Sequence, residues 1–376
     1  MTTRAQKQIQ DLLETVVAEG KERGVQVAAY LNGKLVIDAW AGIADVRTGR
    51  PVAGDTLFPV FSSTKGIAAT LIHILAERGR LDYGMRIADC WPEFAANGKE
   101  NVTLRQALNH TSGIPQMPEG LDHLTLGDWD RMCAEIAKLK PQWPPGSHME
   151  YHAMTFGWIL GEVARRVDGR AFAKLMEDEV CRPLGILDDM FVGAPAAVDG
   201  RVAFLEAHLP PPAPPPAEPL PVPAAPPSVP PLVWPLHEWM NRADARRACI
   251  PASNGIMTAR ALARHYAALV PGGVDGVELL PPERVRLMTV RQQTEPDSGA
   301  LLKDRRGLGY GLGGGEGALE GPRETAFGHG GYGGSFACAD PERRFAVGLT
   351  KNLYFSPKGE AHGQIIAEVR KALGLD

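Results

Sequence analysis

Two adjacent serines and a lysine stand in the stretch FSSTKG, residues 61–66, where a β-like run gives way to an apolar helix pattern. In a helix that starts near this point, Ser62 and Lys65 lie on one side, whereas Ser63 is turned about 100° away. The helix N-terminus favours a developing oxyanion, and a lysine whose pKa falls well below about 10.4 can act as a base. The spacing therefore favours Ser62 as a nucleophile assisted by Lys65. The alternative is a serine cap beside a solvated lysine.

The S-x-x-K spacing is a signature of serine β-lactamases and penicillin-binding proteins. Two later stretches resemble the companion motifs of these proteins. PPGSHMEYHAMTFGWILGEV, which contains Tyr151, is similar to the PG…YSN…G…L.G stretch of class C β-lactamase-like proteins, and FGHGGYGGSFACAD is similar to their K-T-G strand. Residues 104–115 and 252–269 also resemble the family. The chain thus resembles a serine β-lactamase-like esterase, of the group called family VIII carboxylesterases.

The resemblance implies roles for the tyrosine of the second motif and for the residue that follows two positions later. Tyr151 would be a second base or proton shuttle, paired with Lys65. The asparagine of the family pattern is Ala153 in this chain. Because that asparagine touches substrate amides in the family, its replacement disfavours recognition of amides and β-lactams.

The third motif departs from K-T-G at its first residue, where His329 replaces the lysine before Gly330 and Gly331. Two glycines let the backbone approach a bound acyl group closely. The resemblance implies that these three residues contact substrate and that the N–H groups of Ser62 and Tyr332 form an oxyanion hole. A neutral imidazole binds a carboxylate less well than a lysine does, so a β-lactam or a peptide is a weaker candidate substrate than an ester.

These residues together predict a serine hydrolase that cleaves short-chain carboxylic esters through an acyl-enzyme on Ser62, without a cofactor. Lys65 and Tyr151 are expected to titrate as a coupled pair, which leaves the main base open. Alternatives with the same fold are a β-lactamase, a D-amino-acid peptidase, or an enzyme that passes the acyl group to another alcohol. The non-enzyme alternative is an inactive β-lactamase-like binding protein, which the intact set of three side chains disfavours.

Two rival kinds of site are weaker. The stretch HMEYH places His148 and His152 four positions apart, but its order differs from the H-E-x-x-H of metalloproteases, so Glu150 points away from the position of the base. The chain has no G-x-S-x-G, which excludes an α/β-hydrolase nucleophile elbow. We therefore predict no metal site.

Composition narrows the class of protein further. The chain has 376 residues, a formal net charge of −4 and a hydrophobic fraction of 44%, which provides for a core but gives no basic field for nucleic acid or an anionic membrane. Its five cysteines are odd in number and lack a C-x-x-C pair, which indicates free thiols in a reducing compartment. The expected protein is a cytoplasmic enzyme, monomeric or homodimeric, whose partner is a small-molecule ester, with no membrane segment.

The pattern of elements predicts an α+β protein of the β-lactamase/transpeptidase type, with an antiparallel sheet flanked by helices plus a mostly helical region. Residues 1–80 and 300–376 are expected to form the domain that holds the sheet. Residues 81–299 are expected to form the helical domain, which includes a proline-rich insertion at 210–235.

Individual elements are predicted from periodicity and turn residues. Asn32-Gly33 marks a hairpin between two β-like runs. The expected strands are 25–31, 34–41, 334–339 and 344–351, and the expected helices are the amphipathic N-terminal segment and 62–78, 102–109, 125–138, 155–167, 258–269 and 360–373.

Overall fold

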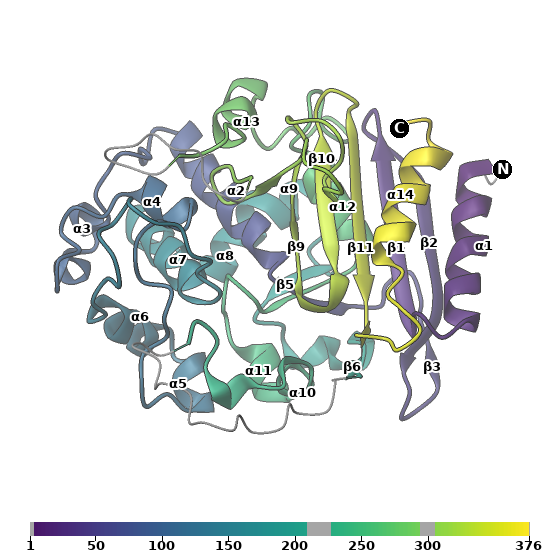
Figure 1. The fold of residues 1–376 in the computed structure, drawn as a ribbon, viewed down its shortest axis with the longest axis horizontal. Helices are drawn as coiled ribbons and strands as arrows, with labels where there is room; N and C mark the ends of the chain where they lie inside the picture. The colour runs from purple at the N-terminus through teal and green to yellow at the C-terminus, as the bar shows by residue number, and fades with distance from the viewer. Residues whose placement is uncertain (1–3, 209–226, 294–304, 376) are drawn as a thin grey trace.

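An antiparallel sheet of seven strands is the largest element of the protein (Figure 1). The computed structural model describes residues 4–208, 227–293 and 305–375. The strands lie in the order β3-β2-β1-β11-β10-β9-β8, so the two ends of the chain share one sheet. The strands are β1 (Gly24–Leu31), β2 (Lys34–Asp45), β3 (Arg50–Pro51), β8 (Gly311–Leu312), β9 (Phe327–Gly330), β10 (Phe336–Asp340) and β11 (Phe345–Lys351).

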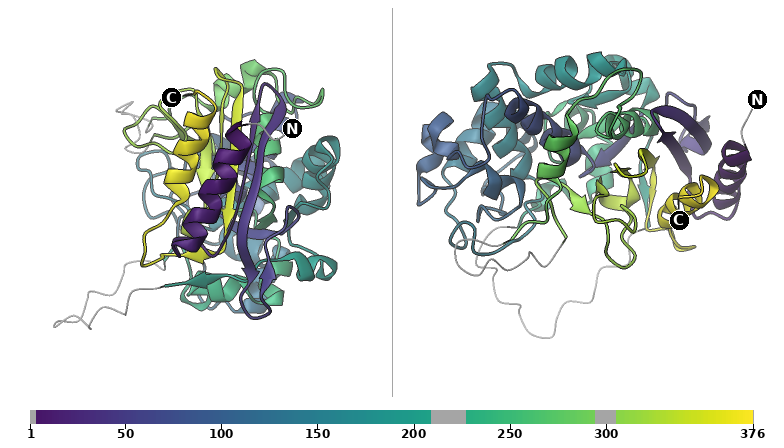
Figure 2. Two further views of the ribbon diagram at one scale, coloured as in Figure 1. Left: turned by 90° about the vertical axis from the view of Figure 1, so that its right-hand side faces the viewer. Right: turned by 90° about the horizontal axis from the view of Figure 1, so that it is seen from above.

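Helices cover both faces of this sheet. Helices α1 (Arg4–Ala18) and α14 (His362–Ala372) lie side by side on one face (Figure 2), and α12 (Ala259–Ala267) packs on the other. Successive side chains of β1 point to opposite faces of the sheet. Val27 belongs to the core under α1 and α14, whereas Ala28 belongs to the core that includes α12. Strand β1 is therefore buried on both faces, and it lies in the interior of the sheet.

Helix α12 approaches the sheet unusually closely at Gly348 of β11. A Cβ atom at this position would lie 2.5 Å from the backbone oxygen of Ala259, so only glycine fits without a shift of the helix. The packing joins α12, which lies in the part 81–299 expected to be a separate helical domain, to the sheet. The division into two domains stays a prediction.

The helical region surrounds α2 (Thr64–Glu77), which is buried from Thr64 to Ala76. A helix that is apolar nearly all round belongs in the interior of a protein. The helices of this region are α3 (Ile87–Cys90), α4 (Leu104–Leu108), α5 (His123–Gly127), α6 (Trp129–Ala137), α7 (Thr155–Asp168), α8 (Phe172–Met176), α9 (Arg182–Leu184), α10 (Leu236–Met240), α11 (Ala243–Arg247) and α13 (Pro282–Met288).

Two small sheets join the helical region to the main sheet. The first has the strand order β4-β7-β5 and leads into α2, and the second pairs β6 with β12. Their strands are β4 (Phe58–Phe61), β5 (Met190–Val192), β6 (Glu206–Ala207), β7 (Gly255–Met257) and β12 (Leu353–Tyr354). Short 3₁₀ segments are η1 (Pro92–Ala95), η3 (Ala196–Arg201), η4 (Pro231–Val233) and η5 (Tyr332–Gly334), and the π-helical turn η2 is Glu177–Cys181.

The α+β fold with its flanked antiparallel sheet is confirmed, and so is the hairpin at Asn32-Gly33. The bounds of several predicted helices differ from the structure by one or two residues, as at α2, where the helix expected at 62–78 begins at Thr64. The helix expected at 125–138 is split at Asp128, whose carboxylate accepts a hydrogen bond from the backbone N–H of Arg131. A side chain that caps a new helix thus interrupts a continuous apolar pattern.

Residues 210–226 of the proline-rich segment lie outside the described residues. Within the described ranges, no helix is both long and apolar enough to cross a membrane. The cytoplasmic location stays a prediction.

Candidate active site

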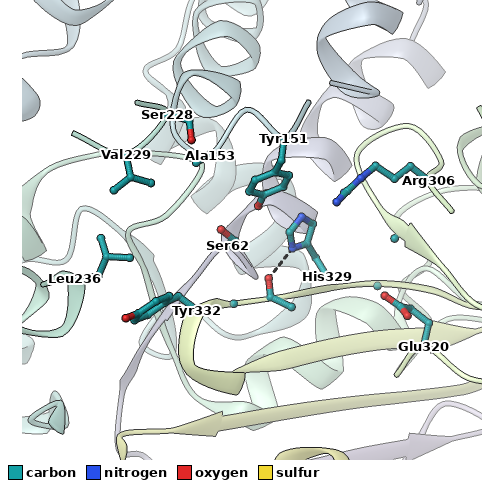
Figure 3. A pocket seen from close by; sticks show the side chains of 14 residues that line it. Ser62, Tyr151, Ala153, Ser228, Val229, Leu236, Arg306, Glu320, His329 and Tyr332 are labelled. Carbon is teal, nitrogen blue, oxygen red and sulfur yellow. Dashed lines mark hydrogen bonds between the residues drawn. The ribbon is translucent and has the colours of Figure 1, made fainter. Parts of the chain in front are cut away.

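A cavity of about 590 Å³ lies where the end of β9 meets the start of α2 (Figure 3). Three predicted site segments meet at this cavity, since Ser62, Tyr151 and the run from His329 to Tyr332 all line it. The remaining lining residues are Ala153, Ser228, Val229, Leu236, Arg306, Gly311, Glu320 and Gly328. Ser228 and Val229 come from the described end of the proline-rich segment, which thereby forms part of the wall.

Ser62 lies in a tight turn between β4 and α2. Phe61, just before it, has a φ of 45°, which is uncommon for a residue other than glycine. The turn is held from both sides by Thr64, whose hydroxyl donates to the carbonyl of Phe61 at 2.5 Å and accepts the N–H of Gly255 at 2.8 Å. Such a strained backbone persists because its surroundings hold it, and strain of this kind gathers at functional sites.

Lys65 touches Ser62 and two backbone carbonyls. Its Nζ lies 3.2 Å from Ser62 Oγ, 2.7 Å from the oxygen of Ala153 and 2.9 Å from the oxygen of Ala252. A neutral amine has two N–H donors and one lone pair. It can therefore donate to both carbonyls and accept the hydroxyl proton of Ser62, which is the arrangement that a general base requires.

The surroundings of Lys65 favour that neutral form. The side chain is fully buried, and burial lowers the pKa of Lys65 well below its usual value, with the guanidinium of Arg306 lowering the pKa further. No carboxylate lies within 4 Å of its Nζ among the described residues. Lys65 thus lacks the partner that would keep it charged.

Tyr151 completes the group around the serine. Its hydroxyl points toward Ser62 (Figure 3), and the Nζ of Lys65 lies 4.7 Å from the centre of its ring. Burial raises the pKa of Tyr151 to about 12, although the neighbouring side chain of Ser62 opposes that rise. The phenol therefore carries its proton at neutral pH, which suits a proton donor better than a base.

His110 packs against the ring of Tyr151, and His152 forms a hydrogen bond with His110. The ring of His110 lies 4.8 Å from that of Tyr151 and 4.9 Å from that of Phe156. Its Nδ1 accepts the backbone N–H of His152 at 3.2 Å, which fixes the orientation of the ring. Burial lowers the pKa of both histidines, to about 4 for His152, so both are neutral at pH 7. Sequence reasoning missed His110, although the stretch that contains it resembles the family.

The two histidines of the stretch HMEYH, the weaker rival site, do not lie together. His148 is exposed and packs edge-on against Trp143, whereas the Nε2 of the buried His152 accepts the N–H of Ile114 at 3.2 Å and lies 2.9 Å from the hydroxyl of Ser112. Among the described residues, no three histidine, cysteine or acidic side chains gather as metal ligands would.

The third motif brings the main sheet against the nucleophile turn at Gly331. A Cβ atom on Gly331 would lie 2.1 Å from the backbone oxygen of Val60, whereas one on Gly330 would make only an ordinary contact, at 3.7 Å from Phe336. The hydroxyl of Ser63 adds a 3.2 Å hydrogen bond to the carbonyl of His329. The close approach places Tyr332 beside Ser62 at the cavity, and the role of their N–H groups as an oxyanion hole stays a prediction.

His329 presents a neutral imidazole to the cavity. Its Nδ1–H donates to the backbone oxygen of Gly330 at 2.7 Å, whereas its buried Nε2 has no hydrogen-bond partner among the described residues. Burial lowers the pKa of His329 to about 3. The Nε2 can therefore accept a hydrogen bond from a bound molecule, but it cannot supply the positive charge of the lysine that it replaces.

Arg306 is the second residue that sequence reasoning missed. Its guanidinium lies 5.2 Å from the centre of the Tyr151 ring and lines the cavity (Figure 3). No motif or periodicity marks it, because it lies in a loop between α13 and β8. Its position could be found only from the folded chain.

Comparison with known proteins agrees with this geometry. A family model described as Beta-lactamase matches residues 9–371. Esterase/beta-lactamase LipL of Mycobacterium tuberculosis is 34% identical over 351 residues, which cover 89% of this chain and 78% of LipL.

Solved structures indicate the same family. The crystal structure of a family VIII carboxylesterase has a TM-score of 0.85 and 32% identity, with 99% of this chain and 98% of that chain covered. A penicillin-binding protein homologue from Caulobacter crescentus has a TM-score of 0.83 and 34% identity, with coverage of 99% and 98%. The resemblance stated from the motifs is confirmed, and the chain belongs to the beta-lactamase family as a serine hydrolase with family VIII carboxylesterases among its structural neighbours.

Proposed function

We propose that the protein hydrolyses short-chain carboxylic esters through an acyl-enzyme on Ser62. The observation that carries the proposal is the contact of Lys65 Nζ with Ser62 Oγ at 3.2 Å, made by a buried amine whose other two contacts are backbone carbonyls. This arrangement activates a serine hydroxyl at neutral pH. We therefore propose Lys65 as the base and the protonated Tyr151 as the acid.

Acylation begins when Ser62 Oγ attacks the ester carbonyl carbon and its proton passes to the lone pair of Lys65. The carbonyl oxygen becomes an oxyanion, held by the N–H groups of Ser62 and Tyr332 in the proposed oxyanion hole. Tyr151 then gives its proton to the leaving alkoxide, and the ammonium of Lys65 restores the proton of Tyr151. One alcohol leaves, and both proton carriers regain their starting forms.

Deacylation repeats these steps with water in place of the serine. Water gives a proton to Lys65 and attacks the acyl carbon. The bond to Ser62 Oγ breaks, and the proton returns to that oxygen. A carboxylic acid leaves and the free enzyme is regenerated, so no cofactor is consumed.

The cavity supports small esters as substrates. Its volume of about 590 Å³ lies within the range of small-molecule sites, and its apolar side is formed by Val229, Leu236 and the ring of Tyr332. An alkoxide leaves more readily than an amine, and this site lacks the asparagine and the lysine of the family pattern, where it has Ala153 and His329. These features favour esters over peptides.

Hydrolysis of β-lactams is a second candidate activity. It is favoured by the similarity to LipL, which is named both an esterase and a beta-lactamase. The same acyl-enzyme would serve this reaction.

The test compares Ser62→Ala with Ser63→Ala on p-nitrophenyl butyrate and a chromogenic cephalosporin. Ser63 is the matched control, because it is adjacent and buried, does not line the cavity, and has a hydroxyl that donates to the backbone oxygens of His329 and Ser335. We expect Ser62→Ala to abolish butyrate hydrolysis and labelling by a fluorophosphonate, and Ser63→Ala to keep both. Full activity of Ser62→Ala would refute the proposal, and the cephalosporin rate of the wild type ranks the second activity.

A further inference from the structure

One turn of the chain, residues 250–255, reaches the proposed base from a distant part of the sequence. The backbone oxygen of Ala252, in this turn, accepts a hydrogen bond from the Nζ of Lys65 at 2.9 Å. The oxygen of Ala153 accepts a second one at 2.7 Å, which leaves the lone pair of the neutral amine for Ser62 Oγ, 3.2 Å away. The alignment of base and nucleophile therefore depends on where the turn holds the oxygen of Ala252.

Asn254 anchors this turn to the end of helix α11. Its side chain is completely buried, and its Nδ2 donates to the backbone oxygen of Ala245 at 2.7 Å and to that of Ala248 at 3.3 Å. Its Oδ1 accepts the hydroxyl of Ser253 at 3.1 Å. A buried polar group that loses its partners costs free energy, so this amide resists any shift of the turn away from α11.

The turn is also packed tightly against two other segments. A Cβ atom on Gly157 of α7 would lie 2.4 Å from the backbone nitrogen of Ala252, so the turn lies directly against the backbone of that helix. The backbone of Asn254 forms a β-bridge with Phe61, the residue before the proposed nucleophile. Because close-packed interiors transmit strain, a shift at Asn254 reaches Ala252, two residues away.

We propose that Asn254 is a positioning residue for the proposed hydrolysis. By fixing the oxygen of Ala252, it keeps the amine of Lys65 aligned with Ser62 Oγ. Asn254 does not line the cavity, so its effect on the reaction passes through the turn. A misplacement of about 1 Å at a reacting group can cost about 100-fold in rate. The inference rests on the proposed function, in which Lys65 is the base.

The experiment is a double-mutant cycle between Asn254→Ala and Lys65→Met. The readout is the second-order rate constant for labelling of Ser62 by a fluorophosphonate, with kcat/KM for p-nitrophenyl butyrate measured alongside. We expect Asn254→Ala to lower both values about tenfold in the wild type. In Lys65→Met, where no amine remains to be aligned, we expect a further loss of less than about twofold. A side chain that only stabilises the fold would lower the rate equally in both backgrounds.

Asn352→Ala is the matched control. Asn352 is also completely buried, and its Nδ2 likewise donates to backbone oxygens, those of Ile43, Ala44 and Phe204. These oxygens belong to β2 and to the segment before β6, so the substitution removes a similar buried amide from a different part of the fold. We expect the labelling rate of Asn352→Ala to stay close to that of the wild type.

An equal loss of rate in both backgrounds would overturn the proposal, and so would an Asn254→Ala variant that is labelled as fast as the wild type. Circular dichroism checks the fold of each variant. Should Asn254→Ala fail to fold, Asn254→Ser replaces it, because serine keeps one donor, and the same two outcomes decide. Failure of the esterase function would look different, since a wild type that is labelled at Ser62 but cleaves no butyrate still allows the cycle to be measured by labelling.

Discussion

Lys65 and Lys351 are both completely buried, yet their surroundings differ in kind. Lys351, at the end of β11, lies 2.9 Å from the equally buried carboxylate of Glu22 and 3.8 Å from Glu360. Lys65 contacts a hydroxyl and two carbonyls. A buried ammonium is tolerated where a carboxylate compensates it, and elsewhere the group loses its proton. The partner, rather than the burial, thus separates a lysine that holds the fold together from one that can take a proton.

The largest effect that tests this comparison is on the reaction rate. Lys65→Met removes the proposed base, so we expect kcat/KM for p-nitrophenyl butyrate to fall by about 10³-fold, within the range typical of general bases. The control is Lys99→Met. Lys99 also donates to two backbone oxygens, those of Ala96 and Leu139, and burial lowers its pKa to about 8, but it lies away from the cavity. Equal losses in the two variants would show that the loss reflects the removal of a buried amine in general.

The second effect is on stability and concerns the other lysine. Lys351→Met leaves Glu22 buried without its partner, and we expect the free energy of unfolding to fall by about 3–5 kcal/mol. Urea denaturation followed by circular dichroism measures this change. The double variant Glu22→Gln/Lys351→Met should regain part of the loss, because no uncompensated charge remains. If the urea midpoint of Lys351→Met equals that of the wild type, the ion pair between Lys351 and Glu22 does not stabilise the fold.

A third and smaller effect concerns two neighbouring glycines. Gly331 packs closely against the turn at Ser62, whereas Gly330 does not. Gly331→Ala forces a methyl group against the backbone oxygen of Val60, and we expect a loss of about 1–3 kcal/mol in stability together with reduced activity. Gly330→Ala is the control, since its methyl group meets only ordinary contacts. Thermal unfolding and ester hydrolysis measure both effects. Similar behaviour of the two variants would mean that the close approach at Gly331 is unimportant.

The smallest effect is a shift in the pH profile. The proposed mechanism requires neutral Lys65, so kcat/KM should fall as the pH drops through the lowered pKa of that group. Arg306→Met removes a cation that disfavours the ammonium, which raises the pKa of Lys65 and moves the acidic limb to higher pH. We expect a shift of less than about one pH unit, as for a single partly screened charge. Arg305→Met should not shift the limb, because the side chain of Arg305 points elsewhere, to the oxygen of Gly313 and to Glu324.

The other titratable groups around Lys65 are not expected to create this limb. His110 and His329 are neutral over the working range because burial lowers their pKa values, and Tyr151 stays protonated. An acidic limb that stays in place in Arg306→Met would assign the titration to a different group. The stability of the protein should also rise with pH between the lowered pKa of Lys65 and its unfolded value near 10.4, because the unfolded chain binds the additional proton.

Sequence reasoning succeeded where short-range geometry decides the outcome. Two such features are the contact between Ser62 and Lys65 and the turn at Asn32-Gly33. Both depend on residues that are close in sequence, so a local sequence pattern predicts them. The exact start of α2 was misplaced by two residues, because the turn before it depends on the contact between Thr64 and the distant Gly255.

Longer-range features could not be predicted in this way. The carbonyls that hold Lys65 come from Ala153 and Ala252, 88 and 187 residues further along the chain, and their side chains carry no signal. Arg306 was likewise invisible, since a single arginine in a loop has no pattern.

The strand order of the main sheet has a consequence for synthesis of the protein. Strand β1 pairs with β11, with Val25 opposite Lys351, so the N-terminal hairpin leaves the ribosome long before its partner exists. Pairing between such distant segments slows folding and leaves a strand edge exposed meanwhile. Gly331 reaches the turn at Ser62 from the same late part of the chain, so we expect the proposed nucleophile to stay inactive until nearly the whole chain has been made. A nascent or truncated chain should therefore not react with cellular esters.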